Sequence, residues 1–318
     1  MSRPGAPRLA FFGLPGPYAA KPLQALCAAG LAPVVVIEGL ERRPNERSRT
    51  SAHPVGAPGG WRARLGLEPK GTGGLVEAAH ALGLDALRTN DANAPKTVSR
   101  LERMQLDAMV VCGFPHLFGP RLLAVARRGG LNLHPGKLPA ERGPAPLFWA
   151  LKSGRTSVDW TLHVLDRGED TGDVVATGTE RFEPGTRALA ILESVAVAAS
   201  PALVRAVRSL LDGDLVRIPQ PPPSTPRGPR PGFRDARIDP GRSAEAIYTF
   251  VAGCAGRYPL FYESAGDRYF VADAISYDPA GELSFEYALT GDRLLLRCHP
   301  GVVELKLRED GALFAAEW

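Results

Sequence analysis

The sequence predicts an α/β protein: a mostly parallel, Rossmann-like sheet with helices on both faces, followed by a small β-rich, OB-like barrel. Three observations predict it. Apolar runs of strand length alternate with helical spacings over the first two thirds of the chain, and a proline-rich segment then interrupts all periodicity. Beyond it, short strand-like runs recur between turns such as SAGD, DPAG and HPG. The length of 318 residues also favours two domains over one.

The chain opens with a strand, a helix and a second strand. RLAFFG (8–13) has the apolar length of a strand, and LPGP then makes a turn. YAAKPLQALCAAG (18–30) has helical spacing closed by a glycine, and APVVVIEG (32–39) is the second strand. Residues 40–73 are rich in Arg, Gly and Pro without periodicity, which predicts a long loop or insertion. A βαβ opening of this kind is typical of a parallel sheet covered by helices.

Alternation of helices and strands resumes after this loop. Helices are expected at 75–83, 94–105, 119–128 and 144–154, and strands at 85–90, 107–114, 131–134 and 157–166. Residues 186–213 are long enough for one helix or two, with Pro201 as a break or kink. Ligands of such sheets bind at the carboxyl ends of the strands. Polar side chains at those ends are therefore the first candidates for a functional site.

A stiff linker divides the chain. Residues 219–232 contain seven prolines in fourteen positions, and we expect domains at 1–212 and 233–318 joined by a linker over 213–232. Residues 1–232 hold 29 Lys and Arg against 20 Asp and Glu, whereas residues 233–318 hold 9 against 14. The C-terminal part is therefore acidic, and it is a poor candidate for gripping nucleic acid through its phosphates.

Composition predicts a cytoplasmic protein with no membrane partner. Apolar residues make up 44% and charged residues 23% of the chain, and no uninterrupted apolar run approaches the roughly 20 residues that span a bilayer. The start of the chain shows no signal-peptide pattern. Four cysteines stand singly, without a CxxC pair, so we expect reduced thiols and neither a disulfide framework nor a metal site.

The stretch LNLH (131–134) places two polar side chains at the end of an apolar strand. Asn132 and His134 are two residues apart, so they point to the same face of the sheet. A satisfied hydrogen bond at a strand end is the plain interpretation of such a pair. Two neighbouring segments favour chemistry instead. LDRGEDTGD (165–173) is an acidic, glycine-containing loop that could orient the imidazole, and GKLPAERGPAP (136–146) leads into a helix N-terminus.

Together these segments resemble a known family. The pattern N-x-H-P-x-x-L-P-x-x-R-G-x-x-P (132–146), followed by a helix, a strand and D-x-G-x-D-T-G-D (166–173), is similar to that of the formyltransferases that use 10-formyltetrahydrofolate. The likeness extends to the opening FFGLPGPYAAKPLQAL. Past the linker, RDARIDP with its helix and barrel resembles methionyl-tRNA formyltransferases and some amino-sugar N-formyltransferases. By this resemblance the catalytic residues are Asn132, His134 and Asp170.

Those three side chains suit the transfer of a formyl group to an amine. The reaction needs a neutral amine, a donor that stabilises the negatively charged oxygen of the tetrahedral intermediate, and a route for the amine proton. His134 can take the proton, Asn132 can donate to the oxygen, and Asp170 can hold and polarise the imidazole.

The resemblance also implies where the formyl donor binds, and it implies no metal. The pterin end of 10-formyltetrahydrofolate would lie between residues 111–117 and the loop 165–170, while Lys137, Leu138 and Pro139 would line the approach of the formyl carrier. The residues implied are Val111, Gly113, Phe114, Leu117, Lys137, Leu138, Pro139, Leu165, Asp166, Gly168 and Glu169. Gly136 and Lys137 stand where many relatives carry serine and leucine, which leaves the details of donor contact open.

The sequence leaves two acceptors open. A small primary amine, such as a nucleotide-linked amino sugar or a natural-product precursor, is favoured by the acidic C-terminal part and by residues 40–70, which lack the loop pattern of enzymes acting on initiator tRNA. Initiator methionyl-tRNA is the alternative. It is favoured by the two-domain length and by the same 40–70 segment, which holds seven Lys and Arg against three Glu.

Three other classes of function compete with these. A dinucleotide-dependent oxidoreductase would need G-x-G-x-x-G, which Gly13 and Gly16 do not form, although Glu38 ends the second strand. A metal hydrolase would use His134, His163 and Asp170, but no H-x-E or HExxH spacing exists. A catalytically inactive folate-binding or interaction module is less favoured, because all three expected polar side chains are present.

Overall fold

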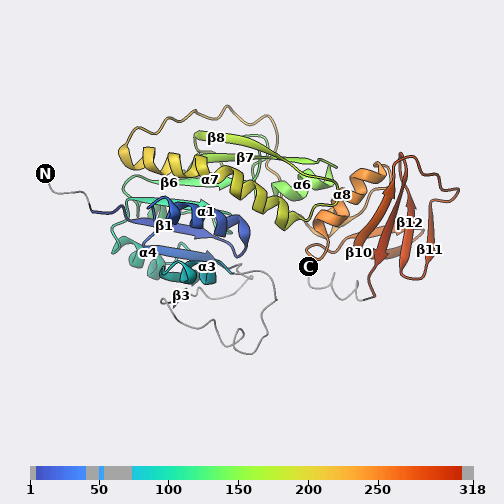
Figure 1. Cartoon of the computed structure of the whole chain (residues 1–318), viewed down its shortest axis with the longest axis horizontal. Helices are drawn as coiled ribbons and strands as arrows, with labels where there is room; N and C mark the ends of the chain where they lie inside the picture. The colour runs from blue at the N-terminus through green and yellow to red at the C-terminus, as the bar shows by residue number, and fades with distance from the viewer. Residues whose placement is uncertain (1–4, 41–49, 54–73, 310–318) are drawn as a thin grey trace. The chain divides into compact units, whose positions relative to one another are not determined.

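The computed structural model describes residues 5–40, 50–53 and 74–309, and its elements largely follow the predicted alternation (Figure 1). In chain order the elements are β1 (Leu9–Gly13), α1 (Pro17–Ala28), β2 (Val35–Gly39), β3 (Thr50–His53), α3 (Leu75–Ala81), β4 (Ala86–Thr89), α4 (Pro95–Glu102), β5 (Ala108–Cys112), α5 (Pro120–Leu123), β6 (Gly130–His134), α6 (Pro146–Lys152), β7 (Ser157–Val164), β8 (Val174–Arg181), α7 (Ala188–Asp212), η1 (Phe233–Ala236), α8 (Ala244–Cys254), β9 (Phe261–Ser264), β10 (Asp267–Asp278), β11 (Tyr287–Thr290), β12 (Arg293–Arg297) and β13 (Val302–Leu307).

The first eight strands build one sheet in the order β3-β4-β2-β1-β5-β6-β7-β8. The five strands from β4 to β6 pair in parallel, whereas β3 pairs antiparallel with β4 and β7 pairs antiparallel with β6. The chain moves outward from β1 to β2 and β4 on one side and to β5 and β6 on the other. Strand order therefore reverses between β1 and β5, which is the point where sheets of this kind bind ligands.

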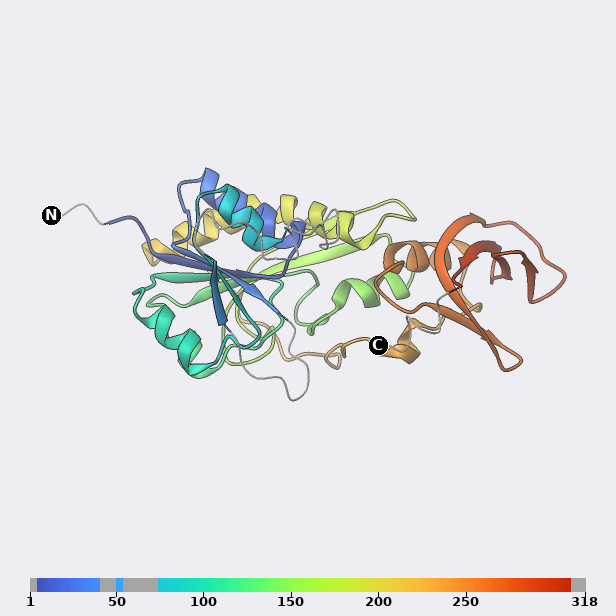
Figure 2. The same cartoon turned by 90° about the horizontal axis from the view of Figure 1, so that it is seen from below.

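Helices cover both faces of this sheet because both faces of its central strands are apolar. All five residues of β1 are buried. Ala10 and Phe12 join a core cluster with Val98 and Leu101 of α4 on one side. Figure 2 shows α1, α3 and α7 on the opposite face from α4. The predicted fold class, a mostly parallel sheet between helices, is confirmed.

Two strands lie outside the sequence prediction. β3 falls inside the segment predicted as loop, where TSAH carries no apolar alternation, and it pairs along the edge of the sheet through β4. Its Thr50 Oγ1 lies 3.0 Å from Thr89 Oγ1. Apart from Leu40, the rest of the predicted 40–73 loop lies outside the described residues. β8 was missed because an edge strand needs no buried face, and most of its side chains are half-exposed or exposed.

One predicted helix is shorter in the structure, and a segment predicted as one helix or two forms a single helix. Only Pro120–Leu123 of the expected 119–128 helix is helical. The chain then turns, Ala126 forms a β-bridge with Leu106, and the Arg127 amide donates to the Leu106 carbonyl. These backbone contacts with the residues just before β5 end the helix early. Residues 188–212, in contrast, form the single helix α7 with Pro201 inside it. Buried Val195, Ala199 and Leu203 pack this helix on both sides of the proline.

By length and composition α7 would also pass as a membrane-spanning helix. Its buried side chains, which include Ile191, Val195, Ala196, Leu203 and Val207, are part of the hydrophobic core. Its outer face carries Arg205 and Arg208, and Arg208 donates to the Ala29 carbonyl of the α1 C-terminus. Packing within the described part of the chain accounts for the buried side chains of α7, which make up 44% of its apolar stretch, whereas Val197 is 53% exposed.

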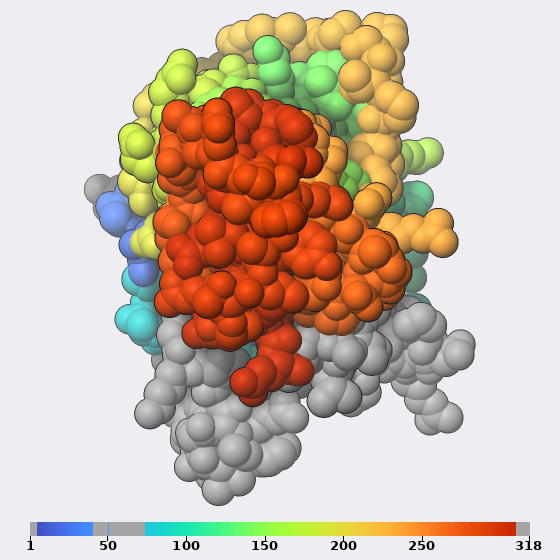
Figure 3. Space-filling view, turned by 90° about the vertical axis from the view of Figure 1, so that its right-hand side faces the viewer, coloured from blue at the N-terminus to red at the C-terminus, as the bar shows by residue number. Residues whose placement is uncertain are grey.

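The C-terminal strands form a second, separate sheet of five antiparallel strands in the order β11-β12-β13-β10-β9. The predicted small β-rich domain is confirmed, and the sheet curls in the manner of an open barrel; a space-filling view shows its surface in orange and red (Figure 3). The Phe233 ring of η1 stacks on Phe261, with ring centroids 4.8 Å apart. The guanidinium of Arg268 lies over both rings.

Contacts divide the chain into two compact units whose boundaries interleave along the sequence. One unit comprises Met1–Arg142, Asp159–Thr179 and Leu192–Pro226, and the other comprises Gly143–Val158, Glu180–Ile191 and Arg227–Trp318. The second unit thus includes α6, which lies before the predicted linker in the sequence. The division into domains at 1–212 and 233–318, joined by a linker over 213–232, stays a prediction.

Glu38, which ends β2, is a buried structural carboxylate. It is 2% exposed and accepts hydrogen bonds from Arg88 Nε at 2.6 Å and from the Val76 amide at 3.1 Å. A second carboxylate, Glu77, lies 3.0 Å from Arg88 Nη2. The carboxylate that a dinucleotide-binding protein would offer to a ribose is therefore already bound to Arg88 and to the first turn of α3.

Replacing Glu38 by Gln should lower the free energy of unfolding by about 2–3 kcal/mol. This loss is below the range for a fully broken buried pair, because Glu77 still balances Arg88. Urea or thermal unfolding measures the loss. Glu102→Gln is the matched control, because it breaks an exposed pair with Arg121 and should cost under about 1 kcal/mol. Equal effects of the two substitutions would contradict the structural role of Glu38.

Candidate active site

The strand pair β6 and β7 positions the polar side chains of the site. The antiparallel register sets Asn132 opposite His163, and it sets His134 opposite Thr161. Directly opposed residues of an antiparallel pair share a face, as do residues two apart in one strand. All four side chains therefore point to one side of the sheet, near the carboxyl ends of β5 and β6. This confirms that Asn132 and His134 are aimed the same way.

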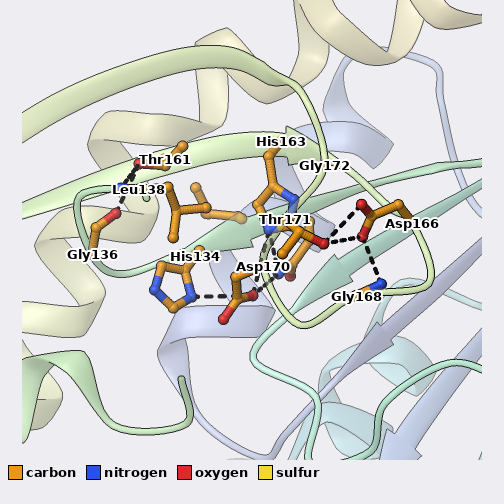
Figure 4. Close-up of polar contacts among 12 residues, drawn as sticks. His134, Gly136, Leu138, Thr161, His163, Asp166, Gly168, Asp170, Thr171 and Gly172 are labelled. Carbon is orange, nitrogen blue, oxygen red and sulfur yellow. Dashed lines mark hydrogen bonds and ion pairs between the residues drawn. The ribbon is translucent and has the colours of Figure 1, made fainter. Parts of the chain in front are cut away.

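The loop after β7 adds a carboxylate to this group (Figure 4). Asp170 Oδ1 lies 3.6 Å from His134 Nδ1 and 3.6 Å from His163 Nε2. Asn132 Nδ2 donates to the same oxygen at 3.4 Å and lies 3.0 Å from His163 Nε2. The structure thus brings the three predicted residues together. It adds His163, which the sequence indicated only for a metal site.

The hydrogen-bond partners of His134 decide which of its nitrogens can accept a proton. Nε2 lies 2.7 Å from the carbonyl oxygen of Glu141, and a carbonyl only accepts, so Nε2 carries the hydrogen. In the neutral ring the lone pair is then on Nδ1, which faces Asp170 across 3.6 Å. The nitrogen of His134 that can accept a proton is therefore Nδ1, and its lone pair points into the group of polar side chains.

Burial keeps His134 neutral. The side chain is 4% exposed, and desolvation lowers the pKa of the imidazole below its ordinary value. The Asp170 carboxylate and the Glu141 carbonyl act in the opposite direction, and His163 opposes charging again. A neutral imidazole near pH 7 is the form that can take a proton from an amine.

Tyr18, in the first turn of α1, was not predicted as part of this region. Its hydroxyl donates to the Leu133 carbonyl at 2.8 Å, beside the end of β6. Burial raises the pKa of this phenol well above its ordinary value, with Cys112 and Asp170 adding to the effect. Tyr18 therefore stays protonated and holds the strand end in place.

The loop that carries Asp170 is built by tight local contacts. The Asp166 carboxylate accepts from the Gly168 amide at 3.0 Å and from Thr171 Oγ1 at 2.8 Å. Asp170 itself has φ 56°, a left-handed conformation that aspartate tolerates better than most residues. A Cβ at Gly172 would overlap the carbonyl oxygen of Val164. The DTGD sequence thus meets backbone requirements at Asp170 and Gly172 as well as supplying a carboxylate.

Gln220 fastens this loop from the start of the proline-rich linker. Its Nε2 donates to the Gly172 carbonyl at 2.7 Å and to the Asp170 carbonyl at 3.0 Å. These two bonds hold the backbone on which the Asp170 carboxylate depends. The sequence offered no signal for this role, because Gln220 lies 50 residues away in a segment predicted to be a spacer.

The segment after His134 is held from β7. Thr161 Oγ1 donates to the Gly136 carbonyl at 2.8 Å and accepts from the Leu138 amide at 3.2 Å. Glu141 closes the turn through its amide to the Lys137 carbonyl at 2.7 Å. This turn positions the Glu141 carbonyl that fixes the tautomer of His134. Of the predicted donor-binding residues in this segment, Leu138 is buried and Lys137 is exposed.

The other predicted donor-binding residues lie around the ends of β5 and β7. Phe114 and Leu165 are partly buried and pack against the same core cluster, to which Val111 belongs. Gly113 has φ 63°, which turns the chain out of β5. Leu117 is 61% exposed. Asp166 and Gly168 are engaged within their own loop, and Glu169 beside them is half-buried.

The three residues considered for a metal site, His134, His163 and Asp170, lie together in the structure. Within the described ranges, no group of three or more His, Cys, Asp or Glu is arranged to hold a metal ion. The Nε2 lone pair of His163 faces the Asn132 amide instead.

Of His163 and Tyr18, which the sequence did not predict for this site, only His163 could have been found from the sequence. The alternation of SVDWTLHVLD shows His163 on the polar side of its strand, and pairing this strand with LNLH in antiparallel register would have placed it opposite Asn132. Tyr18 follows the first turn of the chain, where many residue types are common. Only the former carried a usable signal.

Known proteins resemble this chain in sequence. Residues 64–207 match the family model described as formyl transferase. Among curated proteins, several methionyl-tRNA formyltransferases match. The one from Methylibium petroleiphilum is 30% identical over 240 residues, which cover 76% of this chain and 72% of that protein.

Solved structures share the fold at low identity. An N-formyltransferase from Helicobacter canadensis, in complex with folinic acid and dTDP-3-aminofucose, superposes with a TM-score of 0.62 at 12% identity, covering 95% of this chain and 99% of that one. HypX from Aquifex aeolicus superposes with a TM-score of 0.58 at 17% identity over 95% of this chain. The chain spans 45% of the length of HypX.

Titration of His134, followed by NMR, should have a midpoint below the ordinary histidine value of about 6.5. Asp170→Asn should move that midpoint further down, because the substitution removes a negative charge that favours the imidazolium. Asp159→Asn is the control, since that carboxylate accepts from Thr179 elsewhere on β7 and should leave the midpoint unchanged. A midpoint that rises in Asp170→Asn would refute the coupling.

Replacing Gln220 by Leu should loosen the loop that carries Asp170. Loss of two backbone hydrogen bonds should raise amide hydrogen exchange across residues 166–173 by about tenfold, which corresponds to about 1.4 kcal/mol. Exchange detected by mass spectrometry measures it. Ser224→Ala, an exposed position in the same linker, is the control and should leave exchange there unchanged. Unchanged exchange in Gln220→Leu would show that the loop holds itself.

Proposed function

This chain belongs to the 10-formyltetrahydrofolate-dependent formyltransferase family, and from that premise we propose that it moves a formyl group from 10-formyltetrahydrofolate to the primary amine of a small molecule. Family membership rests on a relative 30% identical over three quarters of both chains. The chain is accordingly an enzyme of folate-dependent formyl transfer. The observation that supports the proposed chemistry is the single carboxylate oxygen of Asp170 shared by Asn132 and His134.

We assign catalysis to Asn132, His134 and Asp170. When the amine nitrogen bonds to the formyl carbon, negative charge develops on the formyl oxygen, and an N–H of Asn132 donates to it. The new ammonium loses its proton to His134 Nδ1, the nitrogen left free by the Glu141 carbonyl. The bond from the formyl carbon to the folate nitrogen then breaks, and that nitrogen takes the proton back from His134. Asp170 stabilises the transient imidazolium.

The residues present suit the folate carrier. A pterin is a flat, partly apolar ring with polar edges, and such rings bind in apolar clefts with a few backbone donors and acceptors. Phe114 and Leu165 offer apolar surface from the two loops that flank the site. Gly113 turns the chain out of β5 at the start of the first of these loops. We therefore place the donor between residues 111–117 and 165–170, with Lys137, Leu138 and Pro139 beside the formyl group.

Charge in the C-terminal unit supports a small acceptor. Three arginines of the second compact unit are engaged by carboxylates of the same unit: Arg187 with Asp273, Arg268 with Glu263 at 3.0 Å, and Arg293 with Glu304 at 2.7 Å. Residues 233–318 carry five more acidic than basic residues. An RNA substrate needs a continuous track of cations for its phosphates, and this balance opposes one.

Initiator methionyl-tRNA is the second candidate. It is favoured by the relatives themselves, since the curated proteins that match over about three quarters of the chain are named methionyl-tRNA formyltransferases. The basic 40–70 segment that would serve this substrate lies outside the described residues, apart from β3.

A folate-release assay separates the two acceptors. With 10-formyltetrahydrofolate as donor, we expect tetrahydrofolate release with one of a panel of amino-sugar nucleotides and none above background with initiator methionyl-tRNA. His134→Ala should reduce release by about a thousandfold or more because the base is lost, while circular dichroism should show that the variant still folds. Release with the tRNA alone would make it the acceptor, and release with neither would favour a folate-binding module.

A further inference from the structure

The Asn132 amide is held in one of its two possible orientations. Rotation by half a turn exchanges the NH2 group with the carbonyl oxygen, and the neighbours decide between the two. In the structure Nδ2 faces His163 Nε2 at 3.0 Å and Asp170 Oδ1 at 3.4 Å. Both contacts are favourable only if the facing atoms accept. Asp170 does so as a carboxylate, so the orientation depends on the state of His163.

The backbone of β7 sets the tautomer of the neutral His163 ring. His163 Nδ1 lies 2.9 Å from the Val164 carbonyl oxygen, which can only accept, so Nδ1 carries the hydrogen. In the neutral ring Nε2 then holds a lone pair, and it accepts from Asn132. The side chain is 2% exposed and directly opposite Asn132 in the β6–β7 register, so it cannot swing away. A reversed Asn132 would set its carbonyl oxygen against this lone pair and against the Asp170 carboxylate.

The two contacts of the amide differ in strength. The bond to His163 is shorter by 0.4 Å than the one to Asp170. Both hydrogens of the NH2 group are engaged, so a developing oxyanion can receive one only if a contact is exchanged. The longer contact, to Asp170, is the one that we expect to be exchanged, and the Asp170 carboxylate then stays beside His134.

We propose that His163 is a positioning residue that anchors the Asn132 amide, so that one N–H stays on His163 Nε2 while the other turns from Asp170 to the oxygen of the reacting formyl group. This rests on the proposed function of the site. His163 does not touch the reacting atoms; it acts through Asn132.

Only the neutral ring can serve as this anchor. A protonated His163 would carry hydrogen on Nε2, facing Asn132 Nδ2 with no lone pair to offer. The charged and titratable groups that face the ring are Asp170 from the loop after β7 and His134 from β6. The other polar atoms against it are the Asn132 amide and the Val164 carbonyl.

The decisive variants are His163→Leu and His163→Gln. Leucine removes the acceptor and should lower kcat by about 10- to 100-fold, with KM for the folate donor changed by less than about threefold, because only a contact to the developing charge is weakened. Glutamine can present an amide oxygen to Asn132 and should recover most of that loss. If His163→Leu turns over like the parent, or if the donor KM rises as much as kcat falls, the anchor is refuted.

A double substitution distinguishes anchoring from a general effect on the fold. If His163 acts through Asn132, adding His163→Leu to Asn132→Ala should cost no further activity, whereas independent roles would multiply. Circular dichroism and thermal unfolding check that each variant folds.

Tautomer spectroscopy tests the anchor without any activity. Long-range proton–nitrogen NMR of the parent protein should show that the neutral ring of His163 carries its hydrogen on Nδ1, and a neutral ring with its hydrogen on Nε2 would refute the anchor. If the parent transfers formyl groups to no acceptor, the proposed function fails while this spectrum still judges the anchor. If the parent is active and His163→Leu equals it, the anchor alone fails.

Discussion

The polar side chains of the site converge on one carboxylate oxygen. Asp170 Oδ1 is 3.4 Å from the Asn132 amide and 3.6 Å from each of two imidazoles, so side chains from two strands converge on a loop residue. Asn132 donates to this oxygen, whereas the two neutral imidazoles turn nitrogen lone pairs toward it, so either ring is attracted to Asp170 only once it is protonated. The rest of the local structure is arranged around this atom.

The loop has to turn back to deliver that oxygen. Since β7 runs antiparallel to β6, the chain leaves β7 beside the start of β6, where the Leu165 amide donates to the Gly130 carbonyl at 2.8 Å. Asp170 must then return toward His134, at the other end of β6. The Asp166 turn, the left-handed backbone of Asp170 and the close approach at Gly172 make this reversal within eight residues. Gln220 holds its far side.

Much of the fold and part of the site follow from local sequence. LAFFG and AMVVC are apolar throughout, which predicts strands buried on both faces, and the structure has them as β1 and β5. The period of two in LNLH placed Asn132 and His134 on one face. β8 escaped because VVATGTER lies at the sheet edge, where no buried face imposes a pattern, and the 119–128 helix was shortened by pairing between Leu106 and Ala126.

By itself the sequence determined the alternation of strands and helices, the polar pair at the end of β6 and the acidic turn that faces it, because these depend on side-chain periods and turn residues within short stretches. Only the tertiary structure decided the partners of those residues. The β6–β7 register chose His163 as the neighbour of Asn132, a carbonyl 7 residues on chose the tautomer of His134, and a linker glutamine 50 residues on held Asp170. Such contacts form when strands pair and when distant segments fold back on one another, and the spacing of residues within a short stretch does not predict them.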